Sequence, residues 1–162
     1  MHRRSFLTLG VPAALAMAVP FSTDSLAASI PKKTPLRPLK KGARLRAVNP
    51  GTWLEPETDF GPLMERCEAE GWTLEVPESV KRQWQWFSGT DQQRVDDLER
   101  AWNNPALDGL IYVGAGWGGA RVLEAGFRFP KRPLWTLGFS DTSSMLMAQW
   151  SAGLAGAIHG ST

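Results

Sequence analysis

Residues 133–142, PLWTLGFSDT, decide the fold of this chain of 162 residues. An apolar run ends abruptly at Gly138, and the helix-like residues 143–150, SSMLMAQW, follow Ser140 and Asp141 almost at once. This order is typical of a strand, a tight turn and a helix, which together form the nucleophile elbow of hydrolases. On such a turn the serine stands clear of the sheet, and N–H groups at the start of the helix can stabilise an oxyanion.

The elbow makes Ser140 a candidate nucleophile. A serine or aspartate at this place is also a common helix N-cap, and Thr142 replaces the final glycine of the Gly-x-Ser-x-Gly pattern. From these residues alone, an N-cap that does no chemistry stays the simpler interpretation.

Strand and helix patterns alternate along the rest of the chain. We expect strands at 44–48, 72–76 and 109–113, and helices at 60–69, 91–103 and 120–125. Such βαβ units predict an α/β fold with an open, mostly parallel sheet and helices on both faces. The functional crevice is then expected at the carboxyl ends of the strands, where Ser140 and the glycine-rich residues 114–119 fall.

The glycine-rich loop 114–119, GAGWGG, allows two interpretations. Its G-x-G-x-x-G spacing fits a dinucleotide fingerprint, with Asp141 about 20 residues further on as a ribose-binding acid. Against this, the fingerprint usually opens the first βαβ unit, and Trp117 would crowd a pyrophosphate. The alternative is that the loop lies over Ser140 and that Gly116 supplies an N–H group to an oxyanion hole.

Several segments, in order along the chain, resemble the LD-carboxypeptidases, also called muramoyltetrapeptide carboxypeptidases, and their microcin C immunity relatives. The similar segments, with the family patterns, are 39–50 (LkpGD.i.ivaP), 88–98 (aGtdeeRaaDL), 104–110 (dpevdaI), 114–123 (RGGYGaaRLL), 138–142 (GySDiT) and 158–160 (hGP). The resemblance implies a flavodoxin-like, three-layer N-terminal domain over residues 44–162, with the family's C-terminal domain missing.

The resemblance also implies a chemistry. Ser140 would be the nucleophile, and the N–H groups of Asp141 and Gly116 would form the oxyanion hole. The implied reaction is hydrolysis of the amide between an L-configured centre and a terminal D-alanine in peptidoglycan stem peptides, with an acyl-enzyme as intermediate. No metal or organic cofactor is implied. Trp53 and Trp117, in loops at strand ends, are expected to face the substrate.

The chain departs from the family pattern in its glycine loop and in its length. Gly114 stands in place of an arginine, and Trp117 in place of a tyrosine. The family's general base and its orienting acid are a His and a Glu of the C-terminal domain. The two histidines of this chain are His2 and His159, and His159 falls in the segment similar to hGP.

We therefore expect the N-terminal half of an exported serine carboxypeptidase, nearly inert alone, whose C-terminal domain would act in cis or in trans. Such a half-domain is expected to leave apolar surface open. The first alternative is a non-catalytic protein that binds peptidoglycan-derived peptides, and a dinucleotide-binding domain ranks third.

The N-terminus indicates export. Two adjacent arginines, Arg3 and Arg4, precede an apolar stretch through about Phe21, and residues 25–28 offer small side chains to a signal peptidase. Residues 1–28 therefore predict a twin-arginine-like signal peptide, the periplasm or another extracytoplasmic compartment, and no membrane attachment after cleavage. A general secretory signal or a retained anchor stays open. Residues 29–43 are interpreted as a basic, proline-containing leader.

Composition gives further expectations about partners, disulfides and the core. A net charge of +2 gives no reason to expect a nucleic acid partner. The single cysteine, Cys67, cannot form an internal disulfide and is expected as a half-buried structural thiol. Strand and helix spacing places most of the other tryptophans in the core, among them Trp72, Trp84, Trp86, Trp102 and Trp135.

Overall fold

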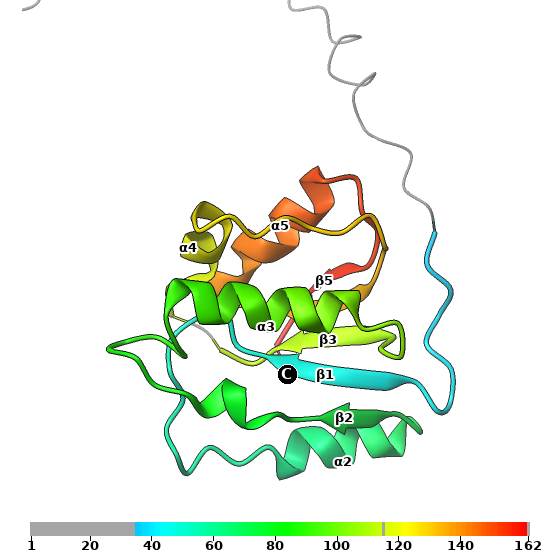
Figure 1. The fold of residues 1–162 in the computed structure, drawn as a ribbon. Coiled ribbons are helices and arrows are strands. Elements are labelled where there is room, and N and C mark those ends of the chain that lie inside the picture. Colours follow the sequence, from blue (N-terminus) through cyan, green and yellow to red (C-terminus); the bar gives the residue numbers. More distant parts are fainter. Residues whose placement is uncertain (1–34, 115, 162) are drawn as a thin grey trace, which may run out of the picture. The chain divides into compact units, whose positions relative to one another are not determined.

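Five parallel strands form the sheet in the order β2-β1-β3-β4-β5 (Figure 1). The computed structural model describes residues 35–114 and 116–161. The strands are β1 (Arg44–Val48), β2 (Thr73–Glu75), β3 (Gly109–Tyr112), β4 (Trp135–Gly138) and β5 (Ala157–His159). This order is that of flavodoxin-like doubly wound folds, so the predicted α/β class and parallel sheet are confirmed.

Helices cover both faces of the sheet and complete three layers (Figure 1). On one face lie α3 (Asp91–Asn103), α4 (Gly119–Glu124) and α5 (Ser143–Ser151), and on the other lies α2 (Gly61–Ala69). Two short 3-10 helices, η1 (Glu78–Lys81) and η2 (Ser140–Thr142), connect these elements. None of the described helices combines the length and the apolar character that a membrane span needs.

Neighbouring side chains of β3 enter two separate cores, as the alternation of a strand requires. Leu110 and Tyr112 pack among side chains of α3, α4 and α5, whereas Ile111 packs with Leu45 and with Cys67 of α2. Burial raises the pKa of the Cys67 thiol, so the thiol stays protonated. Cys67 is thus the expected structural thiol, although it is more fully buried than we predicted.

The start of α3 shows why sequence patterns located the helices well. The N–H of Gln93 donates to Thr90 Oγ1 over 3.2 Å, and the N–H of Thr90 donates to Gln93 Oε1 over 2.9 Å. This reciprocal pair is the predicted capping box, and it satisfies N–H groups that have no partner inside the helix.

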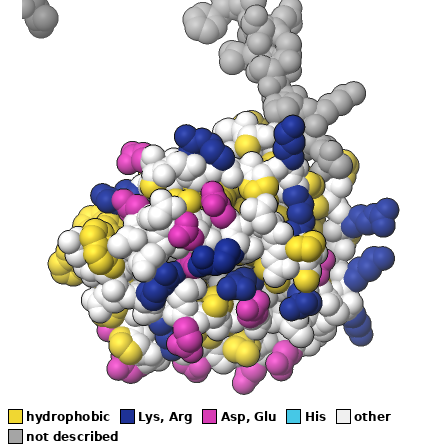
Figure 2. Space-filling view, viewed as in Figure 1, with side chains coloured by type: hydrophobic (Ala, Val, Ile, Leu, Met, Phe, Trp, Pro, Cys, Tyr) yellow, Lys and Arg dark blue, Asp and Glu magenta, His cyan; other side chains and the backbone are white. Residues whose placement is uncertain are grey.

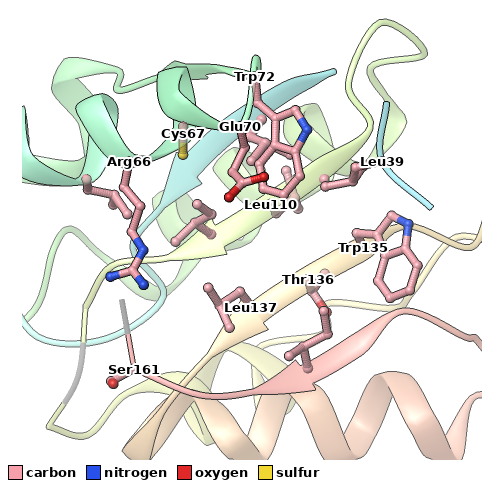
Figure 3. A pocket seen from close by; sticks show the side chains of 15 residues that line it. Leu39, Arg66, Cys67, Glu70, Trp72, Leu110, Trp135, Thr136, Leu137 and Ser161 are labelled. Atoms are coloured by element: carbon pink, nitrogen blue, oxygen red, sulfur yellow. The ribbon is translucent and has the colours of Figure 1, made fainter. Parts of the chain in front are cut away.

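The α2 face is only partly covered within the described residues. A groove of 360 Å³ lies between α2 and the strands β4 and β5 (Figure 3). Leu63 and Trp72 contribute to it from the α2 side, and Leu137 and Ile158 from the strands. Ile158 is 44% exposed. The groove agrees with the expectation that one face of this domain leaves apolar surface open.

Two features differ from the sequence-based expectations. Strand β5 was not predicted, because three residues at a sheet edge are too few to show alternation. Trp84 and Trp86 were expected in the core but are 40% and 69% exposed, so this prediction was wrong for both. They lie on a tight turn that two backbone hydrogen bonds between Trp84 and Phe87 close, with Gln85 at φ 53°. Trp102, by contrast, is fully buried as predicted.

The predicted signal peptide and residues 29–34 of the predicted leader lie outside the described residues. From Pro35 to Lys40 the leader has no regular secondary structure. Trp135 Nε1 donates to the carbonyl oxygen of Arg37 over 2.9 Å and ties this segment to β4.

Candidate functional site

Ser140 lies where β4 ends and η2 begins, and it is exposed. Its φ is 56°, in the left-handed region that residues other than glycine rarely adopt. A Cβ at Gly138 would lie 2.5 Å from Thr142 Oγ1, so only glycine lets the turn fold back so closely on the strand. These features are those of a nucleophile elbow, in which backbone strain holds the serine clear of the sheet.

Thr142 explains how the elbow closes without a final glycine. Its side chain is fully buried. Thr142 Oγ1 donates to the carbonyl oxygen of Phe139 over 2.8 Å and accepts from the N–H of Phe139 over 2.9 Å. The hydroxyl thus links both ends of the turn, a role that glycine could not perform.

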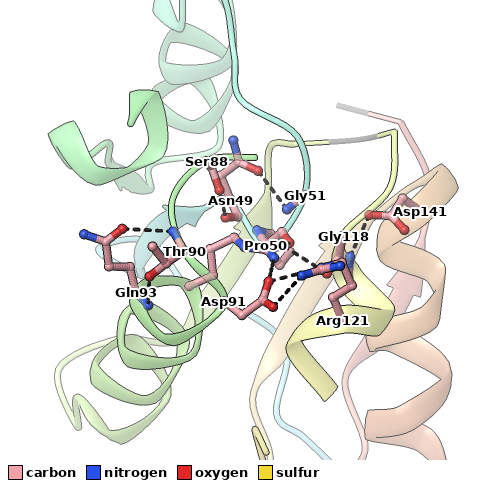
Figure 4. Close-up of polar contacts among 12 residues, drawn as sticks. Asn49, Pro50, Gly51, Ser88, Thr90, Asp91, Gln93, Gly118, Arg121 and Asp141 are labelled. Atoms are coloured by element: carbon pink, nitrogen blue, oxygen red, sulfur yellow. Dashed lines mark hydrogen bonds and ion pairs between the residues drawn. The ribbon is translucent and has the colours of Figure 1, made fainter. Parts of the chain in front are cut away.

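Asp141 joins the elbow to the glycine-rich loop. The N–H of Gly119, the first residue of α4, donates to Asp141 Oδ2 over 2.8 Å (Figure 4). The carboxylate therefore occupies the helix N-terminus at which the dinucleotide interpretation needs a pyrophosphate, and its charge would repel one. The N–H of Asp141 lies in the first turn of η2, where N–H groups have no intrahelical partner, and its part in an oxyanion hole stays a prediction.

The glycine-rich loop packs tightly against the loop that follows β1. Gly116 and Gly118 have φ values of 87° and 134°. A Cβ at Gly116 would lie 2.6 Å from Thr52 Cγ2, and one at Gly118 would lie 2.6 Å from Arg94 Nη1. Gly116 is an exposed residue, and its role as an oxyanion donor stays a prediction.

Arg94, a residue of α3, binds both of these loops. Its side chain is fully buried and donates to the carbonyl oxygen of Pro50 and, over 3.0 Å, to that of Gly118. Arg94 also pairs with Asp91, which accepts from Arg121 of α4 over 2.7 Å. We call Asp91, Arg94 and Arg121 the loop brace.

Charge pairing sets the ionisation of the loop brace. Hydrogen bonding from Arg121, and to a smaller extent from Arg94, lowers the pKa of Asp91 below its usual value. Burial lowers the pKa of Arg94, and the neighbouring Asp91 opposes this shift. The ring of Phe87 adds cation–π contacts, with its centroid 4.7 Å from Arg94 Cζ and 5.1 Å from Arg121 Cζ.

The sequence interpretation missed Arg94, although a signal was present. Arg94 lies four residues before Leu98, on the same side of the helix as that buried leucine. A charged residue on the apolar side of an amphipathic helix indicates a buried interaction, because an unpaired buried charge is strongly unfavourable.

Two residues that differ from the family pattern, Asn49 and Gly114, lie next to each other. Asn49 stands where the pattern ivaP has alanine, and Gly114 stands where the loop pattern has arginine. A Cβ at Gly114 would lie 1.8 Å from Asn49 Oδ1. The Asn49 amide itself donates to the carbonyl oxygens of Thr52 and Val80 over 2.9 and 3.1 Å. Asn49 thus occupies the space that a side chain at position 114 would need.

Three tryptophans line a pocket at the carboxyl edge of the sheet. The pocket has a volume of 550 Å³, and we call it the aromatic pocket; it is lined by Thr52, Trp53, Leu54, Glu55, Thr58, Trp86, Gly116 and Trp117. It lies between the loops that follow β1 and β3, the switch point at which doubly wound folds bind ligands. Trp53 and Trp117 were predicted to face the substrate, whereas Trp86 was missed.

The predicted site residues therefore form two groups. Gly116, Trp53 and Trp117 belong to the aromatic pocket, while Ser140 and Asp141 form the elbow. The hydrogen bond between Gly119 and Asp141 links the glycine loop to the elbow.

His159 lies on β5 beside Gly138, and its ring centroid is 5.4 Å from that of Phe139. Within residues 35–114 and 116–161, no hydrogen bond joins His159 to Ser140 Oγ. These residues also contain no group of three or more His, Cys, Asp or Glu side chains placed to hold a metal ion. The described residues thus place no general base in hydrogen-bond contact with Ser140.

Two solved structures illustrate the similarity of the fold. The microcin C7 self-immunity protein in its apo state superposes with a TM-score of 0.56 at 19% identity, over 69% of this chain and 35% of that chain. A related protein of Bacillus anthracis str. Ames gives a TM-score of 0.54 at 17% identity, over 76% of this chain and 41% of the other. At these identities the likeness establishes the fold.

Sequence comparison establishes the family. A curated Synechocystis sp. protein (strain ATCC 27184 / PCC 6803 / Kazusa), named as a carboxypeptidase, is 33% identical over 136 residues. The match covers 82% of this chain but only 44% of that relative, so the chain spans less than half of the relative's length. Residues 46–160 match the family model of the LD-carboxypeptidase N-terminal domain. The chain therefore belongs to the LD-carboxypeptidase family and contains that family's N-terminal domain.

Proposed function

We propose that this chain is the nucleophile-bearing half of an exported serine carboxypeptidase that cleaves the L,D-amide before a terminal D-alanine in peptidoglycan stem peptides. Family membership supports the class of reaction. The observation that carries the proposal is the elbow: an exposed serine at φ 56°, at the carboxyl end of a parallel strand. A strained serine at that place has the geometry of a nucleophile, whereas an ordinary N-cap needs no left-handed backbone.

The chemistry follows from the positions of the elbow and the loop. Ser140 Oγ attacks the carbonyl carbon of the scissile amide, and the N–H groups of Asp141 and Gly116 stabilise the negative charge on the carbonyl oxygen. D-alanine then leaves after its nitrogen gains a proton. Water hydrolyses the ester on Ser140 and regenerates the free serine.

The reaction needs a general base, because a serine hydroxyl is almost fully protonated near neutral pH. His159 makes no hydrogen bond to Ser140 within the described residues. In this proposal the base therefore comes from a C-terminal domain, supplied in cis or by a partner chain. The chain alone should be nearly inert.

Release of D-alanine from a muropeptide that ends in an L,D-linked D-alanine tests the proposal. The assay uses the native gene product purified from its own cells with any partner bound, and compares it with Ser140→Ala. Loss of the nucleophile should lower the rate roughly a thousandfold or more. Ser151→Ala changes an exposed serine at the end of α5 and is the matched control. Equal rates for the native protein and Ser140→Ala would rule out Ser140 as nucleophile.

A non-catalytic binder of peptidoglycan peptides is the second candidate. The lack of a base beside Ser140 in the described residues favours it. A binder would hold the tetrapeptide equally well in the native protein and in Ser140→Ala, and neither protein would release D-alanine. Calorimetric titration beside the release assay separates the two functions.

The proposal includes export through the segment that begins with Arg3 and Arg4. Replacement of both arginines by lysine should leave the protein in the cytoplasm if the twin-arginine route is used. Cell fractionation followed by intact-mass measurement gives both the compartment and the cleavage position. Export that continues unchanged in the variant would point to the general secretory route.

A further inference from the structure

We propose that the edge of the sheet at which the strands begin docks on an anionic phospholipid surface. The contact is peripheral and reversible, and it departs from the expectation of no membrane attachment after cleavage. It does not depend on the reaction proposed for Ser140. The opposite edge, which carries the elbow and the aromatic pocket, then faces away from the lipid.

Charge is separated between the two edges of the sheet. The described segments that lead into the strands carry six cations and two carboxylates; they are residues 35–43, 70–72, 104–108, 126–134 and 152–156. The described segments that follow the first four strands carry two cations and five carboxylates; they are residues 49–60, 76–90, 113–114, 116–118 and 139–142. We call the six cations of the first group the basic edge; they are Arg37, Lys40, Lys41, Arg128, Lys131 and Arg132. The net charge of +2 hides this separation.

The cations of the basic edge keep their charge uncompensated. Within residues 35–114 and 116–161, none of the six forms an ion pair. Arg128 and Arg132 donate to backbone carbonyl oxygens, which carry no net charge. Asp108, a carboxylate of the same edge, accepts from the backbone N–H of Arg44 over 2.9 Å. Five of the six cations are exposed and Arg132 is half-buried, so their field reaches an approaching anionic surface.

The basic edge lies on one side of the domain. Figure 2 shows Lys and Arg side chains along the right edge of the view, on the side where Figure 1 shows the chain entering β1. Asp and Glu side chains gather instead along the bottom of the same view (Figure 2). A surface with one sign of charge on one side favours a single orientation on a charged plane.

The leader fixes the start of the described chain to this edge. Trp135 Nε1 donates to the carbonyl oxygen of Arg37 over 2.9 Å. A Cβ at Gly156 would lie 2.5 Å from Leu36 Cδ1, so Leu36 packs against the loop that leads into β5. The chain before Pro35 therefore joins the domain at the basic edge.

The sequence before Pro35 is the reason to choose a lipid as the partner. The apolar stretch of the predicted signal ends at about Phe21, and the residues from there to Pro35 span at most about 50 Å when extended. A domain on such a tether stays near the membrane, and the basic edge is the part that the tether joins. A soluble polyanion would account for the charges but not for their place beside the tether.

Vesicle co-sedimentation tests the proposal with the native gene product purified from its own cells. The vesicles consist of phosphatidylcholine alone, or of phosphatidylcholine and phosphatidylglycerol at about two to one. The protein should bind the mixed vesicles and not the neutral ones, and about 0.5 M salt should release it because salt screens the attraction. Equal binding to both kinds of vesicle, or binding to neither, would overturn the proposal.

Lys40→Gln/Lys41→Gln removes two charges from the basic edge. It should weaken partition onto the mixed vesicles at least about tenfold, because each basic residue near an anionic surface strengthens binding several-fold. Arg66→Gln/Lys81→Gln is the matched control, since it removes the same charge from α2 and η1 and should change partition less than about twofold. Equal weakening by both variants would mean that net charge, and not the basic edge, drives binding. Circular dichroism verifies that each variant is folded.

Competition distinguishes a lipid surface from a soluble polyanion. Polyphosphate is added to the mixed vesicles at the same concentration of phosphate as the phosphatidylglycerol. The protein should stay largely on the vesicles, because a plane of charge engages all the cations of one edge at once. Release of most of the protein would mean that the basic edge prefers a soluble polyanion, and the lipid assignment would be wrong.

A last comparison separates this inference from the proposed function. Ser140→Ala should bind the mixed vesicles as tightly as the native protein, because Ser140 lies at the opposite edge. Vesicle binding without release of D-alanine by the native protein would contradict the proposed function alone. Release of D-alanine by a protein that does not bind the mixed vesicles would contradict this inference alone.

Discussion

The loop brace binds the two loops after β1 and β3 that also contribute to the aromatic pocket, but the brace and the pocket are built in opposite ways. In the brace, the charged side chain of Arg94 is fully buried and bound to backbone carbonyls. In the pocket, apolar Trp86 and Trp117 are mostly exposed. The buried charge fixes where the loops lie, whereas the exposed rings contribute little to the fold. The difference suggests that stability and ligand binding can be changed separately at this edge of the sheet.

We expect the largest loss of stability when Arg94 of the loop brace is replaced. Arg94→Met keeps the length of the side chain but leaves the carbonyl oxygens of Pro50 and Gly118 without their donor. We expect a loss of about 3 kcal/mol in the free energy of unfolding, measured by urea denaturation. Arg100→Met, on an exposed part of the same helix, should cost less than about 0.5 kcal/mol. A similar small loss for both variants would show that the brace does not hold the loops.

We expect the next largest loss of stability when a side chain is added at Gly114, beside Asn49. Gly114→Ala places a methyl group on Asn49 Oδ1, and we expect a loss of about 2 kcal/mol in the free energy of unfolding. In an Asn49→Ala background the same change should cost clearly less, because the clash is gone. Gly160→Ala is the control, since a Cβ there would make only an ordinary contact of 3.6 Å with Leu137. Strict additivity of the two changes would contradict the proposed contact.

The contribution of Asp91 to the stability of the loop brace should depend on pH. Its pKa is lowered in the folded protein, chiefly by hydrogen bonding from Arg121, so the carboxylate stabilises the fold at any pH above its unfolded pKa of about 3.9. This contribution is lost as pH falls through the lower folded pKa. Asp91→Asn should therefore cost about 1 kcal/mol at pH 7, and this cost should shrink as the pH falls below about 3.9.

Denaturation curves of the wild type and Asp91→Asn, recorded across this range in low salt, check that prediction. Asp96→Asn, which removes a carboxylate bonded to Gln92 of the same helix, is the control. A stability difference for Asp91→Asn that persists at the acid end would mean that the side chain acts through packing rather than charge.

The smallest expected effect on stability lies in the pocket. Trp86→Ala should change the free energy of unfolding by less than about 0.5 kcal/mol, because the side chain is mostly exposed. Trp102→Ala removes a fully buried ring and should cost about 3 to 5 kcal/mol. Thermal unfolding of the two variants makes the comparison directly. A large loss for Trp86→Ala would mean that this indole supports the loop rather than a ligand.

Much of the fold was predictable, because several helices and strands are marked by local sequence patterns. The capping box at Thr90 marked the start of α3, and the apolar run before Gly138 marked β4. Strand β5 was not predictable, because its three residues pair only through β4. The exposure of Trp86 was also missed, since spacing gives the period of a segment but not whether the segment returns to the core.

The sequence by itself determined the family, the α/β class and the place of Ser140, because each depends on short segments that can be recognised one by one along the chain. Only the tertiary structure decided that Arg94 of α3 holds the loops after β1 and β3, and that Asn49 fills the space beside Gly114. It also decided that Trp53, Trp86 and Trp117 line one pocket. These contacts join residues from separate segments, and a parallel sheet brings such segments together only when its strands pair.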